Sequence, residues 1–345
     1  MTEDMKLADQ EITALQRTAI VIDTVNRSVI DDGFLRDIRA GGLTAVGRTI
    51  LASKPDVFSP FGFPETLRGI VEILESIDAH PDDLMLLKSA QDIQLAKSSG
   101  KVGLYMYFQN PEPIDRQLWR LRLFFELGLR VLQLTYNERS LAGDGCGEAT
   151  DAGLSDFGRL LIKHCNSLGI AIDVSHCGNK TTLEAIEASS APVLITHGMA
   201  RALCDNPRCK TDEAVKACAS KGGVVGVQAM GPFISTKPNP TLDDLLDHVD
   251  YYVQLVGPDS VGLGLDLVTG HERDDFSLLT YKPTIYQGLW QGGVLQRIPG
   301  IETLAEVPNI TRGLLRRGYK DTDVSKILGG NFMRAFGSIW HGEPR

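Results

Sequence analysis

Eight short apolar runs alternate with eight segments of helical periodicity, and this alternation is the feature that most restricts the fold of the chain. The apolar runs lie at 19–23, 44–48, 103–108, 131–135, 170–174, 192–196, 223–228 and 261–265. The helical segments lie at 33–40, 64–79, 90–98, 114–127, 154–168, 179–188, 211–221 and 241–255. Strands that alternate with helices pair in parallel through βαβ units, and continuous apolar runs are typical of strands buried on both faces. The pattern therefore predicts an α/β protein.

Eight strands, each followed by a helix, favour a (β/α)8 TIM-like barrel over a doubly wound open sheet. An open sheet that binds dinucleotides would carry a GxGxxG turn after its first strand, and none follows 19–23. The 345 residues, 43% of them hydrophobic, are enough for one large core. We therefore expect a single barrel domain over 1–345, with extra C-terminal helices from 300–345 packed on its outside.

Charge and composition exclude several classes of function. A formal net charge of −9 argues against nucleic acids and anionic membranes as partners, because both favour basic patches. No apolar stretch approaches the roughly 18 residues of a membrane span, and the acidic start lacks the apolar block of a signal peptide. The six cysteines form no CxxC pair, which indicates free thiols in a reducing compartment. A cytoplasmic protein acting on a small molecule is the expectation.

Residues with catalytic chemistry stand directly after several runs, where a barrel of this kind places its active site. His176 follows the fifth run, His197 the sixth and Asp266 the eighth. One histidine after a strand is usually a capping residue, but two on neighbouring strands can share one divalent ion. An aspartate two strands on can be a further ligand or the general base for a water molecule. His271, soon after the eighth run, is one further histidine near the strand ends.

Five segments carry a resemblance to a known family: LGIAIDVSH, APVLITH, RALCDNPR, GGVVGV and VGLGLD, in this order and spacing. They resemble the membrane dipeptidase (renal dipeptidase) family of the amidohydrolase superfamily. The resemblance implies a (β/α)8 barrel of the metal-dependent hydrolase type, often a homodimer, with two bridged zinc ions. It implies that His176 and His197 ligate one metal and that Asp266 handles the catalytic proton. It also implies that Arg208 holds a substrate carboxylate, a task that suits its planar fork of donors.

The chain departs from this family at four positions. The first strand of the family ends in a His-x-Asp pair that binds the other metal, and here Val25 and Arg27 occupy those places. Gln109 stands where the family has its bridging glutamate. Tyr136 stands where the family has a histidine that contacts the substrate. By this resemblance, one of the two metal sites lacks its own ligands. The residue that would bridge the two metals is an uncharged glutamine.

These departures predict one zinc ion per chain rather than two. Zinc in catalytic sites normally takes three protein ligands, so a third would come from Asp266, Gln109, Asp23 or a water molecule. Arg27 places a guanidinium where the second cation would sit. We expect Arg27, Gln109, Tyr136, Asn137 and Arg208 to contact the substrate.

Three functions remain open at this point. The first is a metal-dependent hydrolase that cleaves a dipeptide or a related small amide bearing a carboxylate. The second is a non-hydrolytic reaction, by a lyase, decarboxylase or isomerase, on a small carboxylated metabolite in the same pocket. The third is an inactive binding homologue, against which the retention of His176, His197, Asp266 and Arg208 argues. The fold alone does not choose among them.

Overall fold

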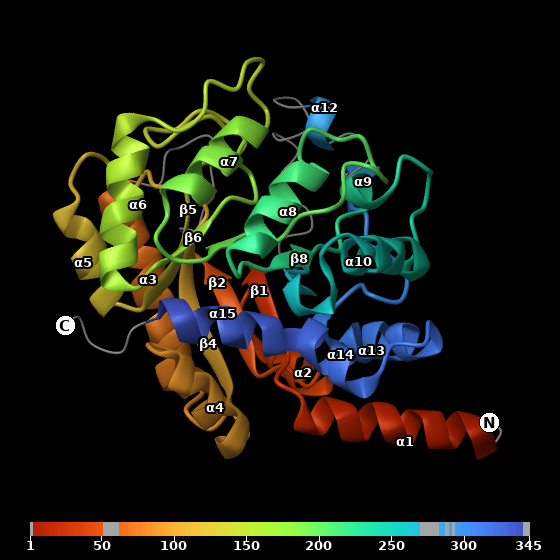
Figure 1. Ribbon diagram of the computed structural model, residues 1–345. Helices are drawn as coiled ribbons and strands as arrows, with labels where there is room; N and C mark the ends of the chain where they lie inside the picture. The colour runs from red at the N-terminus through yellow and green to blue at the C-terminus, as the bar shows by residue number, and fades with distance from the viewer. Residues whose placement is uncertain (1–2, 51–61, 270–282, 287–289, 292–293, 341–345) are drawn as a thin grey trace.

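The computed structural model describes residues 3–50, 62–269, 283–286, 290–291 and 294–340 (Figure 1). Six strands pair in parallel in one order: β1 (Ile22–Asn26), β2 (Ala45–Thr49), β4 (Val102–Phe108), β5 (Leu129–Gln133), β6 (Ala171–Asp173) and β7 (Val193–Leu194). A parallel bridge between Ile195 and Val225 joins β7 to β8 (Val225–Val227), and β8 pairs in parallel with β9 (Val261–Leu263). These strands coincide with the eight apolar runs, so the prediction of a parallel α/β barrel is confirmed.

Side chains of β1 connect it to β9 and so bring the last strand back to the first. The Thr24 hydroxyl donates to the carbonyl oxygens of Leu263 at 3.1 Å and of Thr196 at 2.7 Å. The backbone N–H of Leu265 donates to Asp23 Oδ1 at 2.8 Å. Three short strands lie outside this ring and escaped the sequence analysis: β3 (Leu84–Leu86) beside β4, and the antiparallel pair β10 (Trp290–Gln291) and β11 (Val294–Leu295).

Helices connect the strands, and local chemistry sets their ends. They are α1 (Glu3–Thr18), α2 (Asp32–Ala40), α3 (Phe63–Ala79), α4 (Ala90–Ser99), α5 (Trp119–Glu126), α6 (Asp156–Leu168), α7 (Asn179–Ala188), α8 (Asp212–Ser220), α9 (Gly231–Ile234), α10 (Leu242–Val256), α12 (Pro283–Tyr286), α13 (Val307–Arg316), α14 (Asp321–Ser325) and α15 (Asn331–Ile339). The Ser155 hydroxyl accepts the N–H of Gly158 at 2.9 Å and so caps α6. Gly169 ends that helix in the left-handed conformation, with φ 79°.

Strand β4 shows how the barrel separates its interior from its helical shell. The ring of Phe108 points outward and meets Phe124 of α5, with ring centroids 4.8 Å apart. Tyr105 and Tyr107 point inward on the alternate positions. Tyr107 donates to the carboxylate of Asp173 on β6 at 2.5 Å, across the interior. Only these two of the strand's aromatic residues therefore line the inside.

The C-terminal segment does more than pack against the outer helices. Helix α15 crosses in front of β4 in Figure 1, and its Phe336 ring lies 5.5 Å from that of Tyr105. Trp340 stacks on Phe336 at 4.0 Å and also meets Tyr105 at 5.2 Å. These buried aromatic residues join the inward-facing side chains in one apolar cluster. The tail thus closes part of the barrel interior.

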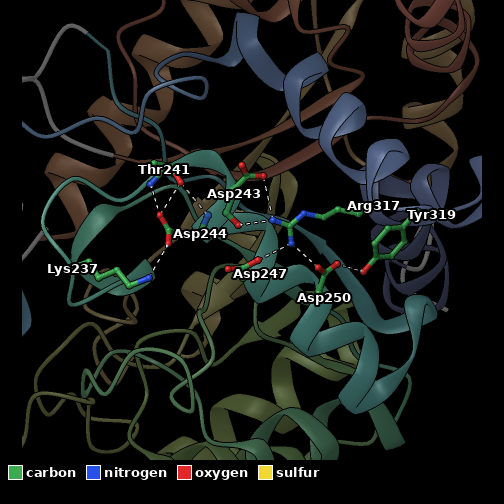
Figure 2. Close-up of polar contacts among 8 residues, drawn as sticks. All are labelled: Lys237, Thr241, Asp243, Asp244, Asp247, Asp250, Arg317 and Tyr319. Atoms are coloured by element: carbon green, nitrogen blue, oxygen red, sulfur yellow. Dashed lines mark hydrogen bonds and ion pairs between the residues drawn. The ribbon is translucent and has the colours of Figure 1, made fainter.

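An ion-pair network fixes α13 against α10, as Figure 2 shows. Arg317, directly after α13, donates to Asp247 at 2.7 Å, to Asp250 at 2.5 Å and to Asp243 at 3.2 Å. Tyr319 donates to the other oxygen of Asp250 at 2.7 Å. Exposed ion pairs stabilise little one by one, but one guanidinium shared by three carboxylates forms a network. The network holds α10, which packs behind β8 and β9, against the C-terminal helices.

Candidate active site

The turn after β6 and the end of β7 are held together by one buried carboxylate. Asp173 Oδ1 accepts the Ser175 hydroxyl at 2.6 Å and the N–H of Thr196 at 2.8 Å. The Ser175 hydroxyl in turn accepts the N–H of His197 at 3.0 Å. Because these contacts link neighbouring strands, the residues that follow both strands are fixed relative to each other. His176 and His197 are therefore brought to the same end of the barrel.

The two imidazole rings face each other through their outer nitrogens. Nε2 of His176 lies 3.0 Å from Nε2 of His197. Nδ1 of His176 contacts Asn137 Oδ1 at 2.7 Å, and Nδ1 of His197 contacts the Thr196 hydroxyl at 2.8 Å. An amide oxygen only accepts, so the proton of His176 lies on Nδ1 and its Nε2 carries a lone pair. Both rings are thus oriented by neutral groups behind them.

A cluster of two tyrosines and one asparagine surrounds His176. The Tyr136 ring stacks on His176 with centroids 4.2 Å apart. Asn137, which orients His176 with its oxygen, donates its amide N–H to the Tyr286 hydroxyl. The Tyr286 hydroxyl also donates to the Tyr136 hydroxyl at 3.5 Å. Helix α12, late in the chain, therefore reaches the residues that follow β5.

Two buried cations brace the backbone at the strand ends. Arg208 donates to the carbonyl oxygens of Ser175 at 2.6 Å and His197 at 2.9 Å. Lys210 donates to the carbonyl oxygens of Val174 at 2.6 Å and Cys177 at 2.8 Å. Arg208 is only 1% exposed, and its Nε has no hydrogen-bond partner in the described part of the chain. One donor of that guanidinium is therefore left for a bound molecule.

Burial and these cations keep both histidines neutral. Burial lowers the pKa of His176 well below its ordinary value. Arg208, His197 and Lys210, in this order, lower it further. Burial first, then the charges of Arg208 and Lys210, lower the pKa of His197. Neutral imidazoles are the form that binds metal ions and accepts protons.

Asp266 lies at the mouth of the barrel, half-buried, in an uncommon backbone conformation. Its φ of 55° falls in the left-handed region that few residues other than glycine adopt, and such strain is typical of functional sites. Burial raises its pKa to about 6, and the positive charges of Arg27 and Arg208 act in the opposite direction. Asp266 is therefore mainly a carboxylate at neutral pH and is able to take up a proton.

The other candidates do not complete a set of acidic or histidine ligands around the imidazole pair. The Asp23 carboxylate accepts the N–H of Leu265 and, at 3.5 Å, the side-chain amide of Asn26. Gln109, half-buried after β4, accepts the Gln133 amide through its backbone oxygen at 2.6 Å. Among the residues that the structure describes, no group of three histidine, cysteine, aspartate or glutamate side chains is placed to hold a metal ion. His271 lies outside the described residues.

The imidazole pair nevertheless fits a single divalent ion. Two nitrogens that share one zinc at about 2.0–2.1 Å lie roughly 3.3 Å apart in tetrahedral geometry, close to the 3.0 Å between the two Nε2 atoms. Each Nδ1 is engaged by a group behind it, as is usual for ligating histidines. Val25, in contrast, is a buried apolar residue and Arg27 a cation, so the described residues do not fit a second ion.

Three site residues escaped the sequence analysis: Gln228, Lys210 and Tyr286. Gln228 directly follows β8 and is fully buried, and neither atom of its amide has a partner in the residues described. It alternates with Val225 and Val227, which belong to the core cluster, so it lies on the inward face of the strand. A polar residue at the end of the apolar run 223–228 was the available signal for Gln228. No local pattern distinguishes Lys210 or Tyr286.

The barrel and the residues at its strand ends define a (β/α)8 protein of the amidohydrolase type. An amidohydrolase structure from Pseudomonas aeruginosa superposes with a TM-score of 0.87 at 35% identity, over 95% of this chain and 99% of the other. The membrane dipeptidase family (peptidase family M19) matches residues 35–275 and 288–341. The chain belongs to this family.

Two further proteins are similar to this chain. An uncharacterized dipeptidase of Schizosaccharomyces pombe is 26% identical over 296 residues, which is 81% of this chain. This chain spans 65% of the length of that relative. A metallopeptidase from Rhodobacter sphaeroides, solved with a phosphinate mimic of the dipeptide L-Ala-D-Ala, has the same fold, with a TM-score of 0.77 and 21% identity over 94% of this chain and 100% of the other. Among the described residues no helix is long and apolar enough to cross a membrane.

Proposed function

We propose that this protein is a hydrolase of the dipeptidase type that uses one metal ion to cleave a small amide bearing a carboxylate. The observation that carries the proposal is the imidazole pair, whose Nε2 atoms converge at 3.0 Å while each Nδ1 is held by a neutral group. His176 and His197 would hold the ion, and zinc is the metal that suits nitrogen ligands in such sites. When bound, the ion would polarise the amide carbonyl and lower the pKa of a water molecule.

The side chains around the pair have separate tasks in this proposal. Asp266 accepts the proton that the attacking water loses and returns it to the leaving amine, a role that suits a carboxyl group with a pKa of about 6. Arg208 binds the substrate carboxylate through its unpartnered Nε edge. A buried donor without a partner costs about 1–3 kcal/mol, so an anion that reaches it recovers this energy on binding. Tyr136, Asn137, Gln109 and Arg27 line the rest of the mouth.

A different reaction on a carboxylated metabolite is the second candidate, and Arg27 is the observation that favours it. A half-buried cation beside Asp266 changes the charge of the pocket where the family carries metal ligands. Such a change alters substrate or chemistry, and a lyase, decarboxylase or isomerase would use the same carboxylate clamp. The five buried cysteines are thiols, which supports a reducing compartment, and we propose the cytoplasm as the site of action.

Metal analysis and a substrate panel test the hydrolase. Elemental analysis of the purified protein should find close to one zinc per chain, and two tightly held ions would refute the one-ion site. Dipeptides with L- and D-residues should be hydrolysed only when zinc is present. His176→Ala should lose both zinc and turnover. His164→Ala, on the exposed face of α6, is the matched control and should retain both. Turnover of another carboxylated metabolite alone would favour the second candidate.

A further inference from the structure

Two arginines act on the same space at the mouth of the barrel from different walls. Arg27 directly follows β1, and Arg208 lies in the loop between β7 and α8. Burial raises the pKa of Tyr136, after β5, while both arginines lower it. Asp266, after β9, likewise lies within the electrostatic reach of both arginines. Arg208 is anchored on the carbonyl oxygens of Ser175 and His197, next to the imidazole pair, and Arg27 follows the end of β1, so both arginines stand at the same end of the barrel.

Arg27 has no structural task in the described part of the chain. It is half-buried, and no hydrogen bond or ion pair engages its guanidinium among those residues. Arg48 on β2 is a useful contrast, because its guanidinium donates to Asn26 Oδ1 at 2.7 Å and to the Ser28 carbonyl at 2.5 Å. Arg48 thus stabilises the end of β1, whereas Arg27 is left with its donors directed to no described group. A half-buried arginine with spare donors is suited to binding an anionic ligand.

Two cations and one carboxylate stand around this space. Arg27 and Arg208 contribute two positive charges, and Asp266 is the carboxylate that both arginines act upon. Lys210, behind the strand ends, adds a further positive charge. A ligand with a free ammonium group would increase the excess of positive charge, whereas a ligand with two anionic groups would offset it.

We propose that the preferred ligand is an amide with two anionic groups and no free ammonium, held by Arg208 at one carboxylate and by Arg27 at the other anionic group. This inference rests on the proposed function and narrows it to N-acyl amino acids whose acyl chain ends in an acidic group. Hydrolysis of such a compound adds water across the amide bond and releases an amino acid and a dicarboxylate. Arg27 is the residue that selects the acidic acyl chain.

Three probes that share an amide-linked alanine test the inference with the full-length protein: N-succinylalanine, N-acetylalanine and alanylalanine. Binding is measured by calorimetry, and product release is measured separately. N-succinylalanine should bind at least about tenfold more tightly than N-acetylalanine, in line with one additional charge-assisted pair, and alanylalanine should bind most weakly. Arg27→Gln should bring N-succinylalanine to the level of N-acetylalanine, and Arg27→Lys should retain part of the preference. Arg36→Gln, on the exposed side of α2, should alter none of these values.

The results separate the inference from the proposed function. Equal binding of the succinyl and acetyl probes, failure of both to bind, or a preference that survives in Arg27→Gln overturns the inference. Preferred hydrolysis of alanylalanine overturns it too, while supporting a dipeptidase. The expected order of binding without release of alanine from any probe supports the inference and refutes hydrolysis.

Discussion

The carboxylate of Asp23 makes the stability of the barrel depend on pH in a direction opposite to that of most acidic residues. Asp23 is 1% exposed between β1 and β9, and burial raises its pKa from 3.8 to about 7. The N–H of Leu265, the Asn26 amide and the Val25 N–H oppose this rise, and the charge of Asp266 adds to it. The substitution that isolates the charge is Asp23→Asn, which keeps an oxygen to accept from Leu265.

The sign and size of the effect follow from proton linkage. A raised pKa means that the folded state holds the proton more tightly than the unfolded state does. The stabilising contribution of the protonated Asp23 is therefore fully present below pH 3.8 and is lost as the pH rises through about 7. The shift of about three pKa units corresponds to about 4 kcal/mol in the free energy of unfolding, of which about 2–3 kcal/mol falls between pH 5 and 7.

Urea denaturation of the wild type and Asp23→Asn at a series of pH values measures this quantity. The difference in the free energy of unfolding should shift by about 2–3 kcal/mol in favour of Asp23→Asn between pH 5 and 8. A constant offset that comes from the amide itself cancels in this comparison. A difference that stays flat over the range would refute the argument from burial.

Asp144→Asn provides a control of opposite sign. The Arg139 side chain, as the main cause, lowers the pKa of Asp144, so its stabilising contribution is present above its unfolded pKa and is lost as the pH falls. The variant should therefore lose stability relative to the wild type as the pH rises from the acidic range. The same trend in both variants would show that a global effect of pH, not the ionisation of Asp23, determines how the free energy of unfolding depends on pH.

Three further predictions follow from the site and the fold. Below pH 6, kcat/KM should fall tenfold per pH unit as Asp266 takes up its proton, and Asp266→Asn should abolish turnover; a flat profile between pH 5 and 7 would exclude it as the base. Asn137→Leu should weaken zinc binding about 10–100-fold in a chelator titration, because His176 loses the group that orients it; unchanged affinity would refute the positioning role. Gly47→Ala should unfold or severely destabilise the protein, because its Cβ would lie 2.1 Å from the Thr24 carbonyl oxygen, whereas Gly337→Ala on α15 meets no atom within 4 Å and should be neutral or stabilising in thermal melts.

Most of the barrel could be predicted from the sequence because its strands are buried on both faces. Burial on both sides makes each strand a continuous apolar run, as in 170–174 or 261–265, and the turns that follow are polar. The short β3 lacks this signature, since Met85 and Leu86 are only partly buried. The interior role of α15 was equally hidden, because an apolar helical face does not reveal whether it packs on helices or on the barrel interior.

The site was predictable only where a residue stands next to a strand end. His176, His197 and Asp266 occupy such places, so barrel geometry alone brings them to one end. Arg208 lies within a long loop, and its location followed from family resemblance rather than from spacing. Tyr286 could not be found in either way, because only the tertiary fold brings it to Asn137, 149 residues earlier in the chain. Local patterns cannot encode such a contact.

An apolar residue and positive charge stand together at the end of β1. Val25 is buried among apolar residues, and Arg48 uses Asn26 and Ser28 to hold the strand end that a metal would otherwise organise. A second divalent ion here would meet the charges of Arg27 and Arg48 without a carboxylate of its own, since Asp23 is engaged by Leu265. Coulomb repulsion and the missing ligands thus act in the same direction. The substitution Val25→His alone should therefore not create a second metal site, because the positive charge of Arg27 would remain beside it.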